Sequence, residues 1–154
     1  MKIVILDNIR SAHNVGSIFR TADGAGVSKI FLVGVTPCPF DRFGRTQSEI
    51  AKTSLGAAEI VPWQHVSDEE AILLLGRLRR EGVKVVAVEQ TPHSVSLDEF
   101  SVPQNVAYIF GNEVDGVSDG LLQASQQVLE IPMAGEKESL NVSVAAGIVL
   151  FARS

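Results

Sequence analysis

Short apolar runs recur along this chain and are separated by longer stretches in which apolar and polar residues are mixed. Each run is five residues long, which suits a buried strand and is too short for an ordinary helix. We therefore expect strands at residues 2–6, 29–33, 84–88, 106–110 and 128–132.

The clearest helical pattern between these runs covers residues 67–80. Ser67 provides an N-cap, Glu70 completes a capping box, and Gly82 follows the last turn. Arginines near the carboxyl end suit the helix dipole. The apolar contacts of this helix are expected from Ile72, Leu74, Leu75 and Leu78.

A second helix is predicted from about Asn14 to Ala25, with Asn14 as its N-cap. Gly16 lies one turn before Arg20 on the same side. Glycine costs on the order of 1 kcal/mol of helix stability relative to alanine, and here it leaves an open surface beside the guanidinium. The alternative is an ordinary surface arginine near a tolerated glycine. The buried face is expected from Val15, Ile18, Phe19 and Ala22.

The alternation of strands and helices predicts an α/β domain with a mostly parallel sheet flanked by helices. Ligands of such sheets bind beyond the carboxyl ends of the strands. The segments that follow those ends are rich in Gly, Asn, Ser or Glu, which suits a binding site. They read DNIRSAHN, EQTPHS, GNEVDG and MAGEKES.

The last predicted helix, from about Asn141 to Ala152, is apolar on every side. A helix of this kind is expected to be buried. Its amino end then faces an interior pocket with unpaired N–H groups and a partial positive charge. Because Ser139, Leu140 and Asn141 stand at that end, we expect a small hydrogen-bonding ligand there.

Length and composition fit one domain, residues 1–154, with a sizeable core. No apolar run reaches the length of a membrane span or a signal peptide. A single cysteine, Cys38, excludes an internal disulfide and offers no metal cluster. We expect a cytoplasmic protein without a bound metal and without membrane association.

Charge is distributed unevenly along the chain. Residues 1–60 hold seven Lys/Arg and five Asp/Glu, whereas residues 61–154 hold six and thirteen. An acidic total is not typical of a general nucleic-acid binder, so any phosphate-binding surface should lie in the first third. Scattered solvated charge is the alternative. The candidate cations are Arg10, Arg20, Arg42, Arg45 and Lys52.

The common nucleotide-binding signatures are missing from the sequence. Neither G-x-G-x-x-G after the first strand nor G-x-x-x-x-G-K-[ST] occurs. The glycines of 24–26 end a helix instead of opening one. In residues 110–118, two glycines permit close backbone approach, and Glu113 at the tip could meet a cation or a sugar hydroxyl. The alternative for this segment is a strand-to-helix turn capped by Ser118.

Three separated blocks, taken together, change this interpretation. They are NVGSIFRTADGAGV (14–27), FGNEVDGVS (110–118) and IPMAGEKESLNVSVAAGIVL (131–150). In this order they resemble the three signature motifs of the SpoU class of the SPOUT superfamily, the TrmH-like RNA 2′-O-methyltransferases. KTSLGAAEIVPW (52–63) is similar to the segment between the first two motifs. The resemblance covers nearly the whole chain, and its third block is very specific.

The resemblance implies an α/β domain with a carboxyl-terminal trefoil knot, a feature that general folding rules would not have suggested. It also implies a homodimer with the active site near the subunit interface, and no separate RNA-binding extension. The implied cofactor is S-adenosylmethionine, held largely by backbone groups in the knot. By position these belong to Gly111, Ile131, Met133, Leu140 and the strand end near Val88.

The family's catalytic positions fall on residues that match its motifs. The essential arginine corresponds to Arg20, and the motif-one asparagine corresponds to Asn14. The motif-two glutamate corresponds to Glu113, and the motif-three serine and asparagine correspond to Ser139 and Asn141. SpoU-class proposals often make the arginine a base. Since a guanidinium pKa above about 12 resists deprotonation, we prefer a role in gripping a phosphate and stabilising the alkoxide.

The implied reaction is methyl transfer to a ribose 2′-hydroxyl of RNA. We expect tRNA as the substrate, with ribosomal RNA as the alternative. Arg10, Arg42, Arg45 and Lys52 are the expected RNA contacts, and Phe40 and Phe43 could stack on bases or simply pack locally. The competing classes are a non-catalytic dimeric RNA-binding protein and a base-directed or small-molecule methyltransferase.

Overall fold

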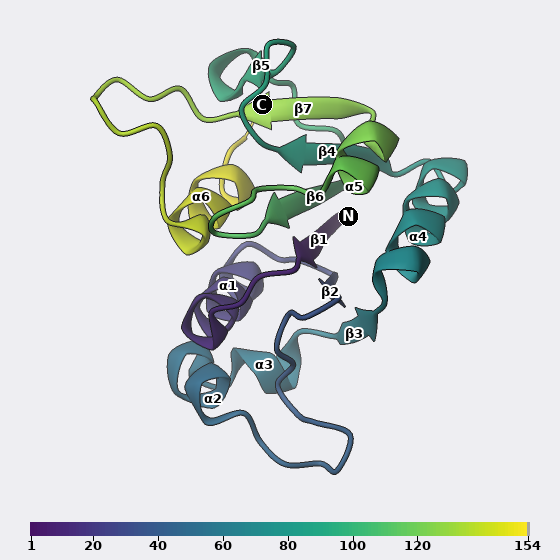
Figure 1. Ribbon diagram of the computed structural model, residues 1–154, viewed down its shortest axis with the longest axis vertical. Helices are drawn as coiled ribbons and strands as arrows, with labels where there is room; N and C mark the ends of the chain where they lie inside the picture. The colour runs from purple at the N-terminus through teal and green to yellow at the C-terminus, as the bar shows by residue number, and fades with distance from the viewer. Residues whose placement is uncertain (154) are drawn as a thin grey trace.

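A sheet of seven parallel strands forms the middle layer of the molecule (Figure 1). The computed structural model describes residues 1–153. The strand order is β3-β2-β1-β6-β4-β7-β5. The strands are β1 (Lys2–Asp7), β2 (Lys29–Val33), β3 (Trp63–Val66), β4 (Lys84–Val88), β5 (Val95–Ser96), β6 (Val106–Gly111) and β7 (Gln127–Glu130).

The register of the central strands explains why the apolar runs are continuous. Ile5 of β1 lies beside Phe31 of β2 on one side and Ile109 of β6 on the other. Successive residues point to opposite faces, and both faces are covered, so nearly every position must be apolar. All five predicted strands are present, and the predicted mostly parallel α/β class is confirmed.

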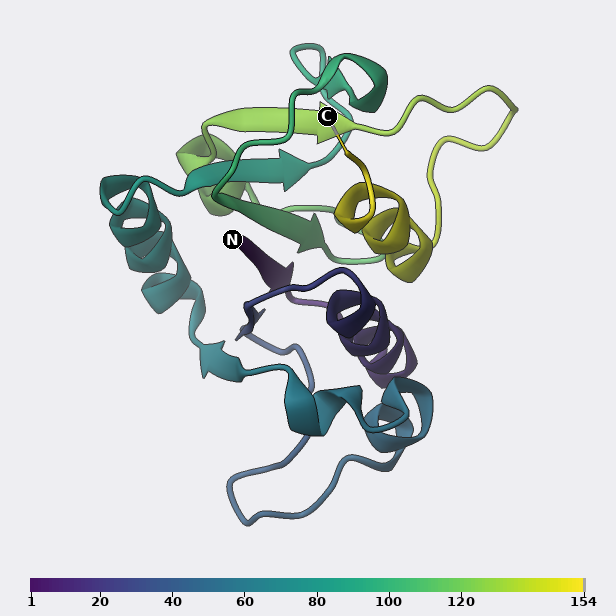
Figure 2. The same cartoon turned by 180° about the vertical axis from the view of Figure 1, so that it is seen from behind.

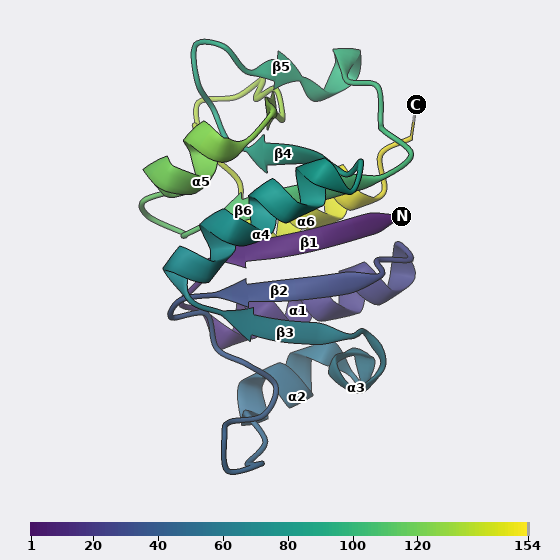
Figure 3. The ribbon, with the colours of Figure 1, turned by 90° about the vertical axis from the view of Figure 1, so that its right-hand side faces the viewer.

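Helices cover the two faces of the sheet in different numbers (Figure 3). One face packs against α4 and α5, and the other packs against α1, α2, α3 and α6. The helices are α1 (Ala12–Gly24), α2 (Ser48–Ser54), α3 (Ala57–Ile60), α4 (Asp68–Arg80), α5 (Asp119–Ala124) and α6 (Val142–Leu150), with a short 3-10 turn at η1 (Leu97–Glu99).

Helix α4 follows its prediction closely. The Ser67 side chain accepts the N–H of Glu70, and the Glu70 side chain accepts the N–H of Ser67, so the capping box is present. Gly82 takes a φ of 84°, as a helix-ending glycine should. Ile72 also lies against another helix, beside Gly120 of α5, but it is 42% exposed and so contributes less to the core than Leu74, Leu75 and Leu78.

Helix α1 begins earlier than expected. Its N-cap is Ser11, whose hydroxyl accepts the N–H of Asn14 at 3.1 Å, so the prediction of Asn14 as N-cap is wrong. Gly16 also has a different role from the expected one. A Cβ at Gly16 would collide with Thr53 and the backbone of Ile50, so the glycine lets α1 and α2 pack closely and leaves no open surface beside Arg20.

Helix α6 is only half buried, which corrects the expectation that it would be buried on every side. Ala146, Val149 and Leu150 are buried in the core that also contains α1. Val144 is 49% exposed, and Ile148 is 39% exposed. An all-apolar composition reveals that a helix avoids water but does not reveal which molecule covers its second side.

The sequence pattern missed several short elements: β3, β5, α2 and α3. It offered α5 only as the alternative interpretation of the segment that ends at Ser118. These elements lack the long periodicity on which such predictions depend. The carboxyl-terminal trefoil knot stays a prediction. Within residues 1–153, no helix combines the length and the apolar character that crossing a membrane requires.

Candidate functional site

A cavity of about 480 Å³ opens beyond the carboxyl ends of β4, β6 and β7. Its walls come from the segments that follow these strands and from the first residues of α6. The segment 131–141, which leads from β7 to α6, stands out from the body of the molecule beside it (Figure 2). The predicted location of the site, at the carboxyl edge of the sheet, therefore holds a cavity of ligand size.

Five carboxylates and an apolar floor line this cavity. The apolar part includes Val88, Leu129 and Ile131. Among the residues that the structure describes, no Lys, Arg or His belongs to the lining of this cavity. The cavity therefore favours a ligand that carries positive charge next to an apolar group. The carboxylates belong to Glu89, Glu113, Asp115, Asp119 and Glu130.

Glu113 connects the β6–α5 loop to the beginning of α1. Its Oε1 accepts the N–H of Ser11 at 3.1 Å, and its Oε2 accepts the N–H of Arg10 at 3.2 Å. Partial burial raises the pKa of Glu113, but hydrogen bonds from backbone groups and the Asn14 side chain outweigh this and leave the pKa below its ordinary value. Glu113 is therefore held as a carboxylate.

Asn141 extends this network to α6. Its Nδ2 donates to Oδ1 of Asn14 at 3.3 Å, while its Oδ1 accepts the N–H of Ser143 at 2.9 Å. The structure thus brings together Asn14, Glu113 and Asn141, although Asn14 and Asn141 are 127 positions apart in the sequence. The expectation of unpaired N–H groups at the amino end of α6 is wrong for one of them, because the side chain of Asn141 accepts the N–H of Ser143.

Glu89 is a site residue that the sequence reasoning missed. It directly follows β4, its Oε2 accepts the N–H of Val117 at 3.0 Å, and its Oε1 accepts the N–H of Gln90 at 3.0 Å. Gln90 in turn donates to the carbonyl of Glu138 at 2.6 Å. The available signal was position alone, since Glu89 is the first residue after an apolar run in a segment expected to border the site.

The end of β1 fixes the β6–α5 loop from the other side. Asn112 donates through Nδ2 to the carbonyl of Asn8 at 2.7 Å. The buried carboxylate of Asp7 accepts the N–H of Ser118 at 2.7 Å. These contacts and those of Glu89 and Glu113 hold one loop against the ends of two neighbouring strands, β1 and β4, so the cavity wall is shaped before any ligand binds.

Gly111 ends β6 at the point where the loop folds back on itself. A Cβ there would collide with the backbone of Gly116 and Val117. Only glycine therefore permits this approach, which leaves backbone groups on the cavity wall. The predicted cofactor residues Gly111, Ile131, Met133, Leu140 and Val88 all line the cavity, as do the predicted catalytic residues Glu113, Ser139 and Asn141.

Arg20 lies apart from these residues. It is exposed on α1 and does not belong to the cavity lining within residues 1–153. Gly24, one turn further along the same side of α1, lies against Phe151, since a Cβ there would stand 3.3 Å from the Phe151 ring. Arg20 therefore lies on the side of α1 that meets the end of α6, and it does not line the cavity of its own chain.

The predicted RNA contacts are also exposed, and two of them border a second cavity. Arg42 and Arg45 line an open groove of about 910 Å³ next to β3. Arg10 lies beside Glu113, and Lys52 is on α2. In the described part of the chain, no cluster of three or more His, Cys, Asp or Glu side chains could hold a metal ion.

Comparison with known proteins gives a consistent result. Residues 1–151 match the SpoU rRNA Methylase family. The 23S rRNA (guanosine-2′-O-)-methyltransferase RlmB of Neisseria meningitidis serogroup B is 33% identical over 148 residues, which are 96% of this chain and 56% of that protein. The chain thus spans about half the length of the curated relatives it matches.

Solved structures agree with the sequence relatives. An AdoMet-bound rRNA methyltransferase from Sinorhizobium meliloti has a TM-score of 0.84 and 33% identity, over 98% of this chain and 54% of that one. A structure described as concerning the 2-OH methylation of C/U34 on tRNA has a TM-score of 0.79 and 26% identity, over 98% of this chain and 92% of that one.

Proposed function

This chain belongs to the SpoU rRNA methylase family, and we propose that it transfers a methyl group from S-adenosylmethionine to a ribose 2′-hydroxyl of RNA. The observation that carries the proposal is the cavity at the ends of β4, β6 and β7, which has five carboxylates and, among the described residues, no cation. Relatives that cover nearly the whole of this chain include methyltransferases of rRNA.

The cavity fits the cofactor in charge, size and lining. S-adenosylmethionine carries a sulfonium and an ammonium, which suit carboxylate walls. The adenine suits the apolar residues Leu129, Ile131 and Leu140, and the volume of about 480 Å³ lies in the range of small-molecule sites. When bound, the cofactor supplies a methyl group on a positively charged sulfur.

The chain's own residues would mainly hold the acceptor oxygen in line and stabilise its developing charge. Glu113, Asn14 and Asn141 form the connected network that orders the beginning of α1 beside the cavity. Ser139 lines the same wall. Arg20 is the proposed stabiliser of the alkoxide and ligand of an adjacent phosphate, since its guanidinium resists losing a proton.

A homodimer would bring Arg20 to a cavity. The exposed apolar side of α6 includes Val144, Ile148 and Phe151, which are 49%, 39% and 53% exposed. Such a patch is costly to leave in water and is typical of an interface. Because Arg20 lies on the side of α1 that meets the end of α6, a second copy packed on α6 would place its own cavity within reach of Arg20 from the first.

We propose ribosomal RNA as the substrate, in place of the tRNA expected from the sequence, because the curated relatives act on 23S rRNA. The tRNA alternative keeps support from solved structures: the one concerned with C/U34 of tRNA matches this chain over 92% of its own length. Arg10, Arg42, Arg45 and Lys52 are the proposed RNA contacts. The expected cytoplasmic location stays a prediction.

The test is to incubate the purified protein with labelled S-adenosylmethionine and with separated ribosomal RNA and tRNA that lack modifications. We expect label in ribosomal RNA. Label in tRNA alone would select the second substrate, and binding of the cofactor without labelling of either RNA would favour a non-catalytic RNA-binding protein. The Arg20→Ala variant should bind the cofactor and fail to transfer the methyl group.

A further inference from the structure

The second cavity differs from the first in chemistry and in the elements that form it. It is lined by residues of the segment 36–48, which follows β2, and of the edge strand β3. Trp63 and His65 supply the β3 wall, and the opposite wall includes Phe40, Arg42 and Arg45. The groove is open and has a volume of about 910 Å³.

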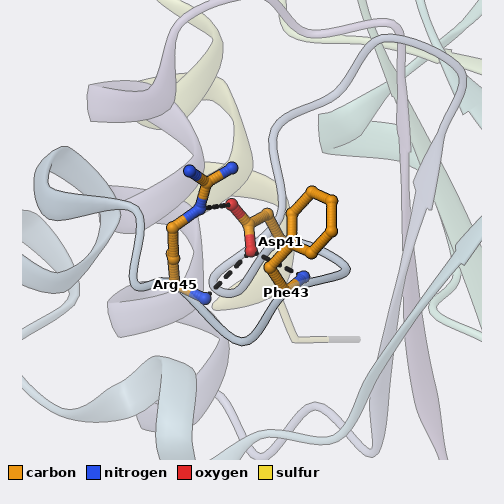
Figure 4. Close-up of polar contacts among 3 residues, drawn as sticks. All are labelled: Asp41, Phe43 and Arg45. Atoms are coloured by element: carbon orange, nitrogen blue, oxygen red, sulfur yellow. Dashed lines mark hydrogen bonds and ion pairs between the residues drawn. The ribbon is translucent and has the colours of Figure 1, made fainter.

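The loop that forms one wall is ordered by a single carboxylate. Oδ1 of Asp41 accepts the N–H groups of Phe43 and Arg45, each at 2.9 Å, and Oδ2 accepts Nε of Arg45 at 2.7 Å (Figure 4). Hydrogen bonds from the backbone and side chain of Arg45 lower the pKa of Asp41. An antiparallel bridge between Phe40 and Thr46 closes the turn.

This turn presents two guanidinium groups on an aromatic ring. The Arg42 and Arg45 guanidinium carbons lie 4.9 and 5.1 Å from the centre of the Phe43 ring, which is itself 67% exposed. Asp41 offsets one of the two positive charges. One net positive charge and flat stacking surfaces therefore remain at an exposed position, which is the chemistry that binds phosphate and nucleobase together.

The β3 wall completes such a site. Trp63 and His65 are two residues apart, so they project from the same face of the strand. Trp63 is half-buried against the core, which fixes its ring, and Nε2 of His65 lies 2.8 Å from the carbonyl of Gly34. The groove thus has a rigid aromatic side and a cationic side, and the hydroxyl groups of Thr46 and Ser48 also line it.

The groove and the acidic cavity share one side of the sheet. Cys38 and Trp63 of the groove pack on the same core cluster as Val88 and Ile131 of the acidic cavity. Four strand spacings separate β3, which carries the aromatic wall of the groove, from β4, a distance of about 19 Å. A single RNA strand a few nucleotides long can cover that distance.

We propose that this groove binds one unpaired nucleotide of the RNA substrate, away from the nucleotide that is methylated. The base would stack between the Trp63 side and the arginine-bearing turn, and the phosphate would meet Arg42. This inference rests on the proposed RNA methyltransferase function, and it adds a requirement for single-stranded RNA next to the target.

The test compares Arg42→Glu with Arg79→Glu, an identical charge change at an exposed position of α4 on the other face of the sheet. We expect Arg42→Glu to raise the KM for RNA by about tenfold or more, with the cofactor Kd unchanged, and Arg79→Glu to change neither by more than about twofold. A short single-stranded oligonucleotide should compete with the substrate, whereas its duplex form should not.

Ultraviolet cross-linking of wild-type protein to the RNA provides a second measurement that no folding defect affects. We expect cross-linked peptides that contain Phe40 or Trp63, the two aromatic residues other than His65 that line the groove. Equal effects of Arg42→Glu and Arg79→Glu, or cross-links confined to other segments, would overturn the inference while leaving methyl transfer intact. A wild-type protein that binds the cofactor and neither binds nor labels RNA would instead overturn the proposed function itself.

Discussion

The two cavities of this molecule have opposite charge although one parallel sheet supports both. The first is lined by five carboxylates, and no Lys, Arg or His among residues 1–153 belongs to its lining. The second carries Arg42, Arg45 and His65 against one carboxylate, Asp41. A small acidic protein can therefore attract a cationic cofactor at one place and a polyanion at another, because the two fields act on ligands at different sites.

The cavities also differ in how they are held. In the acidic cavity, side chains from distant segments bind backbone N–H groups: Glu89 holds Val117, and Glu113 holds Arg10 and Ser11. In the basic groove, one short turn is organised by its own Asp41. The first arrangement depends on the whole fold, whereas the second depends on a local loop, so we expect mutations to affect them differently.

The largest effect is expected from Gly111→Ala. Its Cβ would collide with the backbone of Gly116 and Val117, so the β6–α5 loop must move. We expect the free energy of unfolding to fall by about 2 kcal/mol and cofactor binding to be lost, as measured by denaturant titration and calorimetry. Gly135→Ala is the control, since a Cβ there meets nothing within 4 Å; equal behaviour of the two variants would contradict a backbone-shaped cavity.

A large effect is also expected from Ile148→Lys on the exposed side of α6. A charge in a proposed interface should shift the protein from a dimer to a monomer of 16.5 kDa, measured by light scattering. Methyl transfer should be lost because Arg20 no longer reaches a partner's cavity, while each chain still binds the cofactor. Leu73→Lys, at a position of α4 that is 74% exposed, should leave the mass unchanged; a fully active monomeric Ile148→Lys variant would exclude a shared site.

These differences also explain how much of the molecule could be predicted. Continuous apolar runs identified five of the seven strands, and paired capping signals identified α4, because local chemistry determines both. The polar sequence WQHV concealed β3, an edge strand with one strand neighbour. The motif resemblance named Asn14, Glu113 and Asn141, which the structure connects through hydrogen bonds. The match to the SpoU family confirms the resemblance, whereas the catalytic roles of these residues stay predictions.

What the sequence could not supply was long-range geometry. Ser11, rather than Asn14, caps α1 because either residue type can cap and only the path of the chain selects one. Glu89 gave no signal beyond its place after a strand. The all-apolar pattern of α6 also did not reveal that one side, with Val144 and Ile148, is exposed in the chain.

A moderate effect is expected from Glu113→Gln. Because the pKa of Glu113 in the folded chain is below its ordinary value of 4.5, its stabilising contribution is complete above pH 4.5 and is lost as the pH falls through the lowered pKa. The Tm of wild type should therefore exceed that of Glu113→Gln at pH 7, and the difference should shrink below pH 4.5. Glu136→Gln removes one exposed charge from the nearby segment and serves as control; a constant difference at all pH values would contradict this account.

The smallest effect concerns salt. RNA affinity should fall with ionic strength, and Arg42→Ala should reduce the slope of log K against log salt by about 0.7, the value for one phosphate contact on a single strand. Fluorescence anisotropy at several salt concentrations measures the slope. Arg79→Ala should leave it unchanged, and an unchanged slope for Arg42→Ala would remove Arg42 from the RNA contacts.

The most direct measurement of the central claim is the position of the transferred methyl group. RNA labelled by the protein from S-adenosylmethionine is hydrolysed in alkali, which cannot cleave next to a methylated 2′-oxygen. The account predicts label in an alkali-resistant dinucleotide. Label released in single nucleotides would mean methylation of a base and would contradict it.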